Sequence, residues 1–493
     1  MKKITFYTLG VLFFMFNSTL NGIEVTPLQK IMAEKAVKAI SENNPAVATK
    51  FTADPTVLIY NDTVYIYGTN DAQQAEYSLG KQDNSYNKIS SLNIFSSKDL
   101  VNWTDCGEIA IGGKQNPQGC AKWANNSWAP AACVKKINGK DKFFIYFADN
   151  GNGIGVVCSD SPTGPFVDPI GKPLVSRSTP NCSKVYWLFD PAVLIDSDGK
   201  GYLYFGGGHQ KDVAHPKSAR VAALNDDMIS LAGDPVEIDA PWLFEDSGIN
   251  KIGNTYYYSY CSNWADRKDA KGDEVPPAAV IAYMTSSSPL GPFKYAGYTL
   301  KNPGNYFGAW GNNHHWIFEF KGKHYIAFHA QQMEKKLGFE KGGYRNVCLA
   351  DFKINEDGSW PIQTASNGGV KAVANFDPYT LVKGPTYATS KNAVSTNNQT
   401  LAGIAAESYV YLKNVDFSKG AESITINTGA ANKKSLVKVY KDSISSENLL
   451  CQVKTKGKGS FREKMPIAKS LNLVCNIYIV FDQNSEIESW KVE

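Results

Sequence analysis

The chain has 493 residues, of which 43% are hydrophobic and 20% are charged, a profile typical of a globular protein large enough for two domains. Its formal net charge is only +4 and no run of basic residues occurs, so the sequence indicates neither a nucleic-acid partner nor a membrane-surface partner. Aromatic residues are abundant, which favours β structure and also suits surfaces that stack against sugar rings.

The first residues have the pattern of an export signal. Two lysines precede a mostly apolar run over residues 4–16, and small polar residues follow. The apolar run is too short to cross a bilayer. We therefore expect residues 1–22 to be a signal peptide and the mature chain to be secreted or extracytoplasmic. Residues 23–46 contain a helix-like patch at 28–40, which we expect to pack against the following domain.

One pattern recurs five times between residues 47 and 375: an acidic or polar residue, an apolar run, a turn of Gly, Asn or Asp, and an aromatic strand. The five copies are Ala53–Tyr67, Trp128–Phe147, Phe189–Phe205, Trp242–Tyr260 and Asn313–His329. Self-similar strand hairpins at intervals of roughly 50 to 75 residues indicate a β-propeller. Because each hairpin begins at the inner end of a blade, four residues that head copies are predicted to converge on the central axis: Asp54, Asp190, Glu245 and His314.

The rest of the chain changes in composition. Residues 376–393 contain proline and glycine and are expected to form a linker, and residues 394–493 hold several strand-like segments. The predicted fold is therefore all-β, with a five-bladed β-propeller in residues 23–375 followed by a β-sandwich. Nine is an odd number of cysteines, so at least one has no partner within the chain. Cys451 and Cys475 are expected to form a disulfide in an exported protein.

The fourth copy carries a chemical signal. Glu245 closes the bulky run Trp242–Phe244, and a carboxyl group crowded by apolar side chains loses solvation, so its pKa rises. A raised pKa is what a general acid needs near neutral pH. A loop carboxylate beside a core strand would show the same local pattern, and the neighbouring Asp246 is a rival acid.

Acids at the heads of several blades would face one pocket. Two carboxyl groups across such a pocket are the minimum for hydrolysing a glycosidic bond with inversion, since one protonates the leaving oxygen and the other activates water. A third carboxylate can raise the pKa of its neighbour and keep that neighbour protonated. From the residues alone, a calcium-binding or purely sugar-binding propeller would fit as well.

The ordered heads of the copies resemble glycoside hydrolase family 43. The resemblance rests on Ala-Asp-Pro at 53–55, Trp-Ala-Pro at 128–130, Phe-Asp-Pro at 189–191, the run 242–245 and Asn-His-His at 313–315. That family comprises five-bladed, inverting, mostly exo-acting enzymes on arabinose- and xylose-containing glycans. The resemblance implies that Asp54 is the general base and Glu245 the general acid. It also implies that Asp190 modulates the pKa of the acid and orients it.

The fifth copy implies a site on the axis. The family's histidine at this position commonly touches a calcium ion or a water-filled centre. His314 matches it best, and His315 is the alternative because Trp316 stands where the family often has serine. Since calcium prefers oxygen ligands, a structural calcium ion beside His314 would be held mostly through water.

Within the family, the chain looks most similar to the arabinoxylan arabinofuranosidase group, through Asn44-Pro45, Thr49-Lys50-Phe51 and Gly343-Tyr344-Arg345. The resemblance implies an exo-acting enzyme that removes α-L-arabinofuranose side chains from arabinoxylan or xylo-oligosaccharides. Arg345 would then hold a sugar hydroxyl, although a surface salt bridge is the alternative. Trp128 and Trp310 would wall the pocket, and the alternative is that they only pack the blades together. The alternative functions are a β-xylosidase of the same family and a sugar-binding propeller without catalysis.

Residues 394–493 resemble, more weakly, carbohydrate-binding module family 6. The resemblance rests on Val415-Asp416-Phe417, Val480-Phe481 and Trp490. The Glu-Ala-Glu string with which that family usually opens, and which helps to hold calcium, is missing from the sequence. The resemblance implies a sugar-binding module, and the alternative is a sandwich that only packs on the propeller.

Overall fold

The computed structural model describes residues 18–20, 23–209, 214–268, 270, 272, 274–396, 399–465, 473–483 and 485–493. Most of the predicted signal peptide lies outside these residues. The short strands β1 (Ser18–Leu20) and β2 (Ile23–Val25) pair antiparallel at the start of the described chain. A search of the described helices finds none with the length and apolar character needed to cross a membrane.

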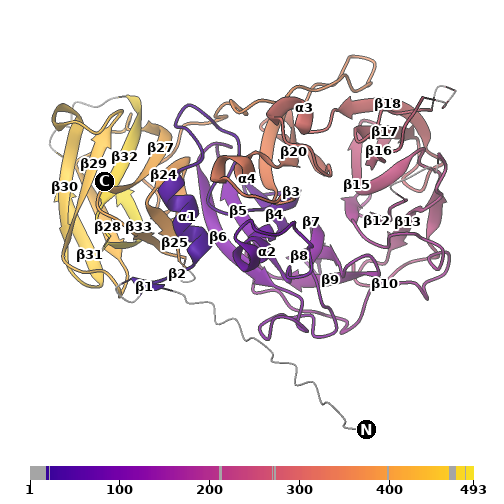
Figure 1. The fold of residues 1–493 in the computed structure, drawn as a ribbon, viewed down its shortest axis with the longest axis horizontal. Coiled ribbons are helices and arrows are strands. Elements are labelled where there is room, and N and C mark those ends of the chain that lie inside the picture. Colours follow the sequence, from indigo (N-terminus) through magenta and orange to yellow (C-terminus); the bar gives the residue numbers. More distant parts are fainter. Residues whose placement is uncertain are drawn as a thin grey trace, which may run out of the picture.

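Five antiparallel sheets follow, which we call blades I to V (Figure 1). Blade I contains β3 (Ala53–Tyr60), β4 (Thr63–Thr69), β5 (Ser91–Ser97) and β6 (Trp103–Ala110). Blade II contains β7 (Trp128–Ile137), β8 (Lys140–Ala148), β9 (Gly153–Ser159) and β10 (Val175–Ser176). Blade III contains β11 (Ala192–Ile195), β12 (Gly201–Phe205), β13 (Ala219–Leu224) and β14 (Val236–Ile238). Blade IV contains β15 (Leu243–Ile252), β16 (Thr255–Ser262), β17 (Ile281–Ser286) and β18 (Lys294–Leu300). Blade V contains β19 (His315–Phe320), β20 (Lys323–Ala330) and β21 (Asn346–Asp351).

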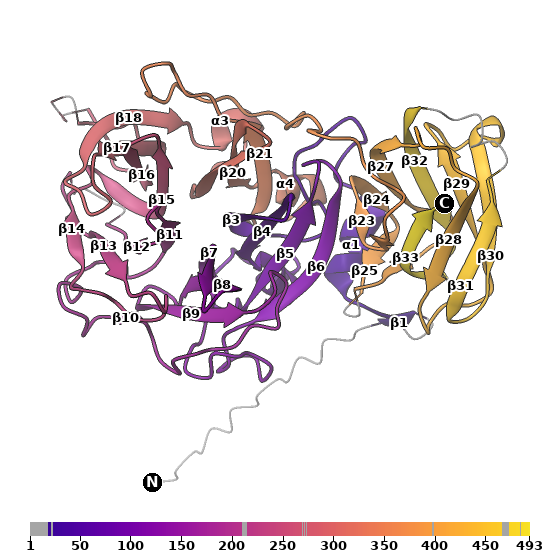
Figure 2. The ribbon, with the colours of Figure 1, turned by 180° about the vertical axis from the view of Figure 1, so that it is seen from behind.

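The first strands of the blades form a closed ring. β3 contacts β7, β7 contacts β11, β11 contacts β15, β15 contacts β19, and β19 contacts β3. The ring of blades is visible from both sides of the molecule (Figures 1 and 2). This arrangement is a five-bladed propeller, and it confirms the fold predicted from the repeated pattern.

Tight turns set the register of the inner hairpins. Asn61 and Asp62 join β3 to β4, and Lys321 and Gly322 join β19 to β20, all with positive φ. Two-residue turns with positive φ at both positions match the twist of antiparallel strands, and Asn, Asp and Gly adopt this conformation most readily. Because every blade starts with its inner strand, the first residues of these strands meet at one end of the axis.

Two sheets form the C-terminal β-sandwich. One contains, in order, β25 (Ala393–Ser395), β26 (Leu401–Gly403), β33 (Glu486–Val492), β28 (Ser423–Thr428) and β31 (Gly459–Lys464). The other contains, in order, β24 (Thr389–Lys391), β27 (Ser408–Asp416), β32 (Val474–Phe481), β29 (Ser435–Lys441) and β30 (Leu449–Thr455). The one-turn helix η1 (Ser446–Asn448) precedes β30. Buried aliphatic side chains and Trp490 form the core of this domain.

The segment predicted to be a linker, residues 376–393, carries short strands of its own. β22 (Val382–Lys383) pairs with β33 of the sandwich, whereas β23 (Thr386–Tyr387) pairs with β6 and extends blade I. β24 then pairs with β27. The segment is therefore hydrogen-bonded to both domains.

The predicted disulfide between Cys451 and Cys475 is wrong. All nine cysteines are free thiols. Cys451 lies on β30 and Cys475 on β32, and β29 runs between these two strands. Neighbouring strands lie about 4.8 Å apart, so cysteines separated by a whole strand are too distant to be bridged.

Helices lie outside the sheets: α1 (Pro27–Lys35), α2 (Asp71–Ser78), α3 (Gly304–Phe307) and α4 (Gln332–Leu337). α1 begins with a capping box formed by Thr26 and Gln29, which satisfies backbone groups at its first turn. It contacts α2 and α4 of the propeller domain and also β24 and β25. The helical patch predicted to pack against the propeller therefore also packs against the sandwich, and it lies between the two domains (Figure 1).

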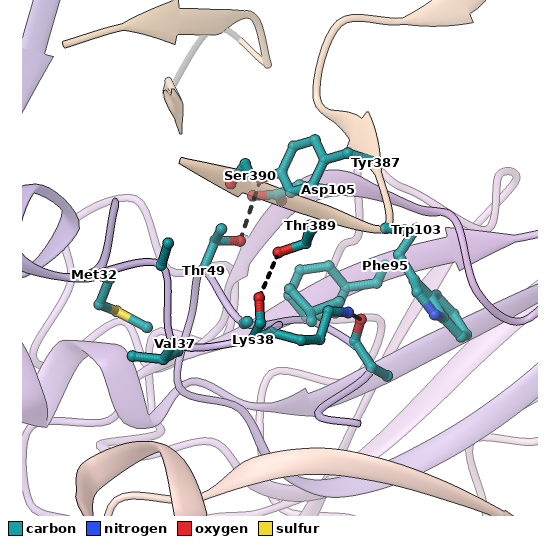
Figure 3. A pocket seen from close by; sticks show the side chains of 15 residues that line it. Met32, Val37, Lys38, Thr49, Phe95, Trp103, Asp105, Tyr387, Thr389 and Ser390 are labelled. Carbon is teal, nitrogen blue, oxygen red and sulfur yellow. Dashed lines mark hydrogen bonds between the residues drawn. The ribbon is translucent and has the colours of Figure 1, made fainter. Parts of the chain in front are cut away.

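A small cavity of about 20 Å³ lies at this junction, with room for about one water molecule (Figure 3). Lys38 lines it, and its Nζ donates to the carbonyl oxygens of Pro45 and Ala46, both at 3.0 Å. The carbonyl oxygen of Lys38 accepts a hydrogen bond from Oγ1 of Thr389 at 3.1 Å. Burial, reinforced by the charge of Lys413, lowers the pKa of Lys38 to about 7. The junction thus contains a buried amine.

Candidate active site

The heads of the inner strands have unusual backbone conformations. Asp54, Asp190 and Asp246 have positive φ, of 48°, 49° and 69°. The register of β3 and that of β15 also shift at these heads. Bulges and left-handed residues re-aim side chains and are common beside active sites. Here the carboxyl groups of three blades meet at the axis, where ring nitrogens of His314 lie within 3.7 Å of all three aspartates.

Asp54 is buried and hydrogen-bonded on both oxygens. Oδ1 accepts from Nη1 of Arg345 at 2.8 Å and lies 3.1 Å from Nδ1 of His329, and Oδ2 accepts from Oγ1 of Thr69 at 2.7 Å. Burial alone would raise the pKa of Asp54, but Arg345, His329 and His314 hold it well below the usual range. Asp54 therefore stays ionised and can accept a hydrogen bond, and then a proton, from water.

Glu245 and Asp190 share this buried centre but differ in their partners. Among the described residues, Oε1 of Glu245 has no hydrogen-bond partner, whereas Oδ2 of Asp190 accepts the backbone N–H of Asp246 at 3.0 Å. Burial first, then the charges of Asp190 and Asp54, raise the pKa of Glu245 well above its ordinary value. Burial and the charge of Asp54 also raise the pKa of Asp190. Because the backbone donor stabilises the anion of Asp190, Glu245 is the member of the pair that keeps its proton.

Asp246, the rival acid, is engaged by the two histidines of blade V. Oδ1 accepts the backbone N–H of His315 at 3.1 Å and lies 3.2 Å from Nε2 of His314. Oδ2 lies 2.5 Å from Nδ1 of His315, whose Nε2 is 2.8 Å from Oγ of Ser259. With both oxygens engaged, Asp246 is less suited than Glu245 to protonate a leaving group.

His314 faces the carboxylates with both ring nitrogens. Nδ1 lies 3.5 Å from Asp54 and 3.7 Å from Asp190, and Nε2 lies 3.2 Å from Asp246. Burial lowers the pKa of this imidazole. A calcium ion takes six to eight oxygen ligands, whereas in the described part of the chain no group of three or more His, Cys, Asp or Glu is arranged to hold a metal ion. The residues at the axis therefore do not fit a directly coordinated calcium ion.

Arg345 belongs to a buried ion network. Besides its bond to Asp54, it donates from Nε and Nη2 to the two carboxylate oxygens of Asp71, at 2.8 Å each. Its guanidinium also lies 4.9 Å from the centre of the Tyr86 ring. Since the side chain is buried, the alternative of a surface salt bridge is wrong. These contacts use three of the five N–H donors of the guanidinium, and two are left for a ligand.

The two tryptophans predicted to wall the pocket differ in position. Trp128 heads β7, and its Nε1 donates to the carbonyl oxygen of Tyr86 at 3.2 Å. Because Tyr86 contacts Arg345, Trp128 lies beside the acidic centre. Trp310 lies in the loop between α3 and β19, is 60% exposed and packs against Gly304.

Sequence reasoning missed four residues that hold the site together: Thr69, Asp71, Tyr86 and His329. Oγ1 of Thr69 accepts the backbone N–H of Ala129 at 2.7 Å, so the same hydroxyl that bonds Asp54 ties blade I to blade II. Asp71 and Tyr86 come from the long loop between β4 and β5. A long loop on a β scaffold is a general signal of a binding face. Thr69 and His329 sit on second strands, where the pattern indicates only strand residues.

Known proteins resemble this chain over most of its length. The model of the family described as "Glycosyl hydrolases family 43" matches residues 43–361. An arabinoxylan arabinofuranohydrolase of Bacillus subtilis (strain 168) is 44% identical over 413 residues, covering 80% of this chain and 80% of the relative. One of Paenibacillus polymyxa is 41% identical over 466 residues, covering 90% of this chain and 72% of the relative.

Two solved structures extend the comparison. The crystal structure of a family 43 arabinoxylan arabinofuranohydrolase from Bacillus subtilis in complex with cellotetraose has a TM-score of 0.86 and 40% identity. It matches 94% of this chain and 99% of its own. An α-L-arabinofuranosidase from Clostridium thermocellum has a TM-score of 0.51 and 36% identity, over 67% of this chain and 99% of its own. The propeller, the acids at its axis and the family match together show that this chain belongs to glycosyl hydrolase family 43.

Proposed function

We propose that this chain is an inverting, exo-acting hydrolase that releases α-L-arabinofuranose side chains from arabinoxylan or xylo-oligosaccharides. The observation that carries the proposal is the buried pair at the axis, in which Arg345 keeps Asp54 ionised while burial and Asp190 keep Glu245 protonated. The relatives named arabinoxylan arabinofuranohydrolases supply the substrate class.

Each side chain has one task in the proposed reaction. Asp54 binds a water molecule, which attacks the anomeric carbon of the arabinose. As the new C–O bond forms, Asp54 takes a proton from that water, and the bond between the anomeric carbon and the xylan oxygen breaks. Glu245 gives its proton to the leaving oxygen. The products are arabinose of inverted configuration and the unsubstituted xylose unit.

Three further residues position the substrate. Asp190 keeps Glu245 protonated before the reaction and orients it. Arg345 holds a sugar hydroxyl with its two remaining donors, because a planar fork of N–H groups suits such a contact. Trp128 walls the pocket beside Tyr86, and the exposed ring of Trp310 contacts the polymer.

Product analysis tests this function. The purified chain is incubated with arabinoxylan and, separately, with xylobiose, and released monosaccharides are identified. Arabinose from arabinoxylan with no xylose from xylobiose supports the proposal. Xylose from xylobiose would indicate a β-xylosidase, and no product from either would indicate a non-catalytic sugar-binding propeller. Glu245→Gln serves as the inactive control, and Glu319→Gln, on an exposed side chain, as the active one.

We also propose three properties of the whole chain. Export is supported by the pattern of residues 1–22, and detection of the processed chain outside the cytoplasm tests it. Sugar binding by the β-sandwich is supported by the resemblance of residues 394–493, and affinity electrophoresis on arabinoxylan tests it. A calcium ion held through water near His314 has only the family resemblance as support. Metal analysis of the purified chain tests it, and calcium takes no part in the proposed reaction.

A further inference from the structure

Asp71 is a buried carboxylate whose hydrogen bonds, among the described residues, all come from Arg345. It is completely buried at the first position of α2, in the loop that follows β4. Oδ2 accepts from Nε and from the backbone N–H of Arg345, at 2.8 and 3.1 Å, and Oδ1 accepts from Nη2 of Arg345 at 2.8 Å. All three hydrogen bonds thus come from Arg345. Asp71 binds both the backbone N–H of Arg345 and the two-pronged edge, or fork, of its guanidinium.

The guanidinium is divided unequally between two carboxylates. Its two-pronged edge, Nε and Nη2, lies on Asp71, whereas Asp54 receives only Nη1, at 2.8 Å. A guanidinium fork prefers to bind one carboxylate with two parallel hydrogen bonds. If Asp71 were absent, the fork would be free to turn onto Asp54. The attraction between the buried guanidinium of Arg345 and the buried carboxylate of Asp54 would favour this turn.

A two-pronged contact of Arg345 with Asp54 would hinder the base. Oδ2 of Asp54 already accepts from Thr69 and Oδ1 from Arg345, so the remaining lone pairs must receive the reacting water. A second bond from Arg345 would take one of these two sites, and it would also stabilise the anion further and weaken its affinity for a proton. The single bond leaves room for water.

We propose that Asp71 is a positioning residue that reserves the fork of Arg345 and thereby leaves Asp54 free to act as the base. The proposal rests on the proposed function in that it takes Asp54 as the base. The ring of Tyr86 against the guanidinium limits its rotation from a second side. Asp71 touches neither the sugar nor the reacting water and acts through Arg345.

The test compares kcat, KM and thermal stability for Asp71→Asn, Arg345→Lys and the double variant. Asp71→Asn removes the charge and one of the two acceptor oxygens, so the two-pronged contact with Arg345 is lost and kcat should fall roughly 10- to 100-fold while KM changes less. A lysine ammonium cannot form a fork. The double variant should therefore regain at least roughly fivefold in kcat over Asp71→Asn, a non-additive result. Asp62→Asn, the same substitution at an exposed turn of blade I, should match the wild type.

A purely structural role for Asp71 makes the opposite prediction. In that case the double variant would have a kcat equal to or below that of Asp71→Asn, and this result overturns the proposal. If Asp71→Asn does not fold, the double variant is compared with Arg345→Lys: kcat values within about threefold support the proposal, and a further loss of tenfold or more contradicts it. An aryl α-L-arabinofuranoside is the substrate. A wild type inactive on it and on arabinoxylan would instead refute the proposed function.

Discussion

Four acidic side chains meet at the propeller axis, and their hydrogen-bond partners give them different roles. Asp54 is paired with Arg345 and stays ionised, while Asp246 is engaged by two histidines. Asp190 has a backbone donor, whereas Oε1 of Glu245 has no hydrogen-bond partner among the described residues. In the proposed reaction, neighbouring carboxyl groups in different surroundings therefore supply both the acid and the base.

The effects of replacing the proposed acid, Glu245, and the proposed base, Asp54, should depend differently on the leaving group. Glu245→Gln cannot donate a proton, so cleavage of arabinoxylan should fall by at least about 10²-fold, the usual size of a general-acid contribution. An aryl arabinofuranoside with an activated leaving group needs less protonation and should lose less. Asp54→Asn should slow the cleavage of both substrates equally, since water must be activated in either case. Full activity of Glu245→Gln on arabinoxylan together with an inactive Asp246→Asn would show that Asp246 is the acid.

The pH profile reports the charge of Asp190. Activity requires a protonated Glu245, so the alkaline limb of the profile follows the ionisation of Glu245. Burial and the charge of Asp190 raise the pKa of Glu245. Asp190→Asn removes that charge and lowers this pKa, so the alkaline limb should move to lower pH, as measured by kcat/KM against pH. An alkaline limb that stays in place would contradict the role given to Asp190.

At the residue level, sequence reasoning found the acids because each heads a repeated pattern. It could not find Asp71 or His329, because their roles depend on contacts between blades far apart in sequence. It also left His314 and His315 unresolved. In the structure His314 faces three carboxylates, while the ring of His315 turns to Asp246 and to Ser259 behind the centre.

At the scale of elements, the hairpins were predictable and their fine register was not. Alternating apolar residues and turn residues indicate each hairpin, but the shifts in β3 and β15 depend on packing at the axis. The strands β22 to β24 in the predicted linker are only two or three residues long and form because both domains offer free strand edges. No local pattern marks strands that short.

The close packing of β15 against blade V gives an element-scale prediction. A Cβ added at Gly248 would lie 2.5 Å from Oγ of Ser259 and 3.0 Å from the His315 ring. Gly248→Ala should therefore destabilise the propeller by about 1–3 kcal/mol, measured by thermal unfolding. Gly233→Ala is the matched control, because a Cβ there meets nothing within 4 Å. Equal melting temperatures for the two variants would show that β15 has room at Gly248.

At the scale of the whole molecule, propeller and sandwich are joined by a shared sheet edge, by α1 and by the buried junction around Lys38 (Figure 3). The sequence indicates two domains but not this arrangement. The helical pattern at the N-terminus shows which face of α1 is apolar, and it does not show that two domains cover that helix. Lys38 gave no signal either, since a lysine is normally exposed.

Lys38 should make stability depend on pH. Below about pH 7 its amine is charged in both the folded and the unfolded chain, so folding bears the full cost of burying the charge. Between about 7 and the ordinary value of 10.5, the folded chain has lost this proton while the unfolded chain keeps it, so stability rises with pH. The Lys38→Met variant has no amine at this position, so its free energy of unfolding lacks this pH-dependent contribution.

The stability of the wild type relative to Lys38→Met should therefore increase by up to about 2 kcal/mol between roughly pH 7 and pH 9. Urea unfolding at both pH values measures it. Lys30→Met, on an exposed side chain of α1, is the matched control and should show no such change. If the free energies of unfolding of the wild type and of Lys38→Met differ by the same amount at both pH values, the lowered pKa of Lys38 at the junction is contradicted.

Asp54 and Glu245 together should hydrolyse the arabinofuranosyl bond with inversion at the anomeric carbon. Proton NMR of the first product formed from an α-L-arabinofuranoside, recorded before the released sugar equilibrates, tests it most directly. We expect β-L-arabinofuranose to appear first and the α anomer only later, by mutarotation. Initial release of the α anomer would show retention through a covalent intermediate and would contradict the roles given to both residues.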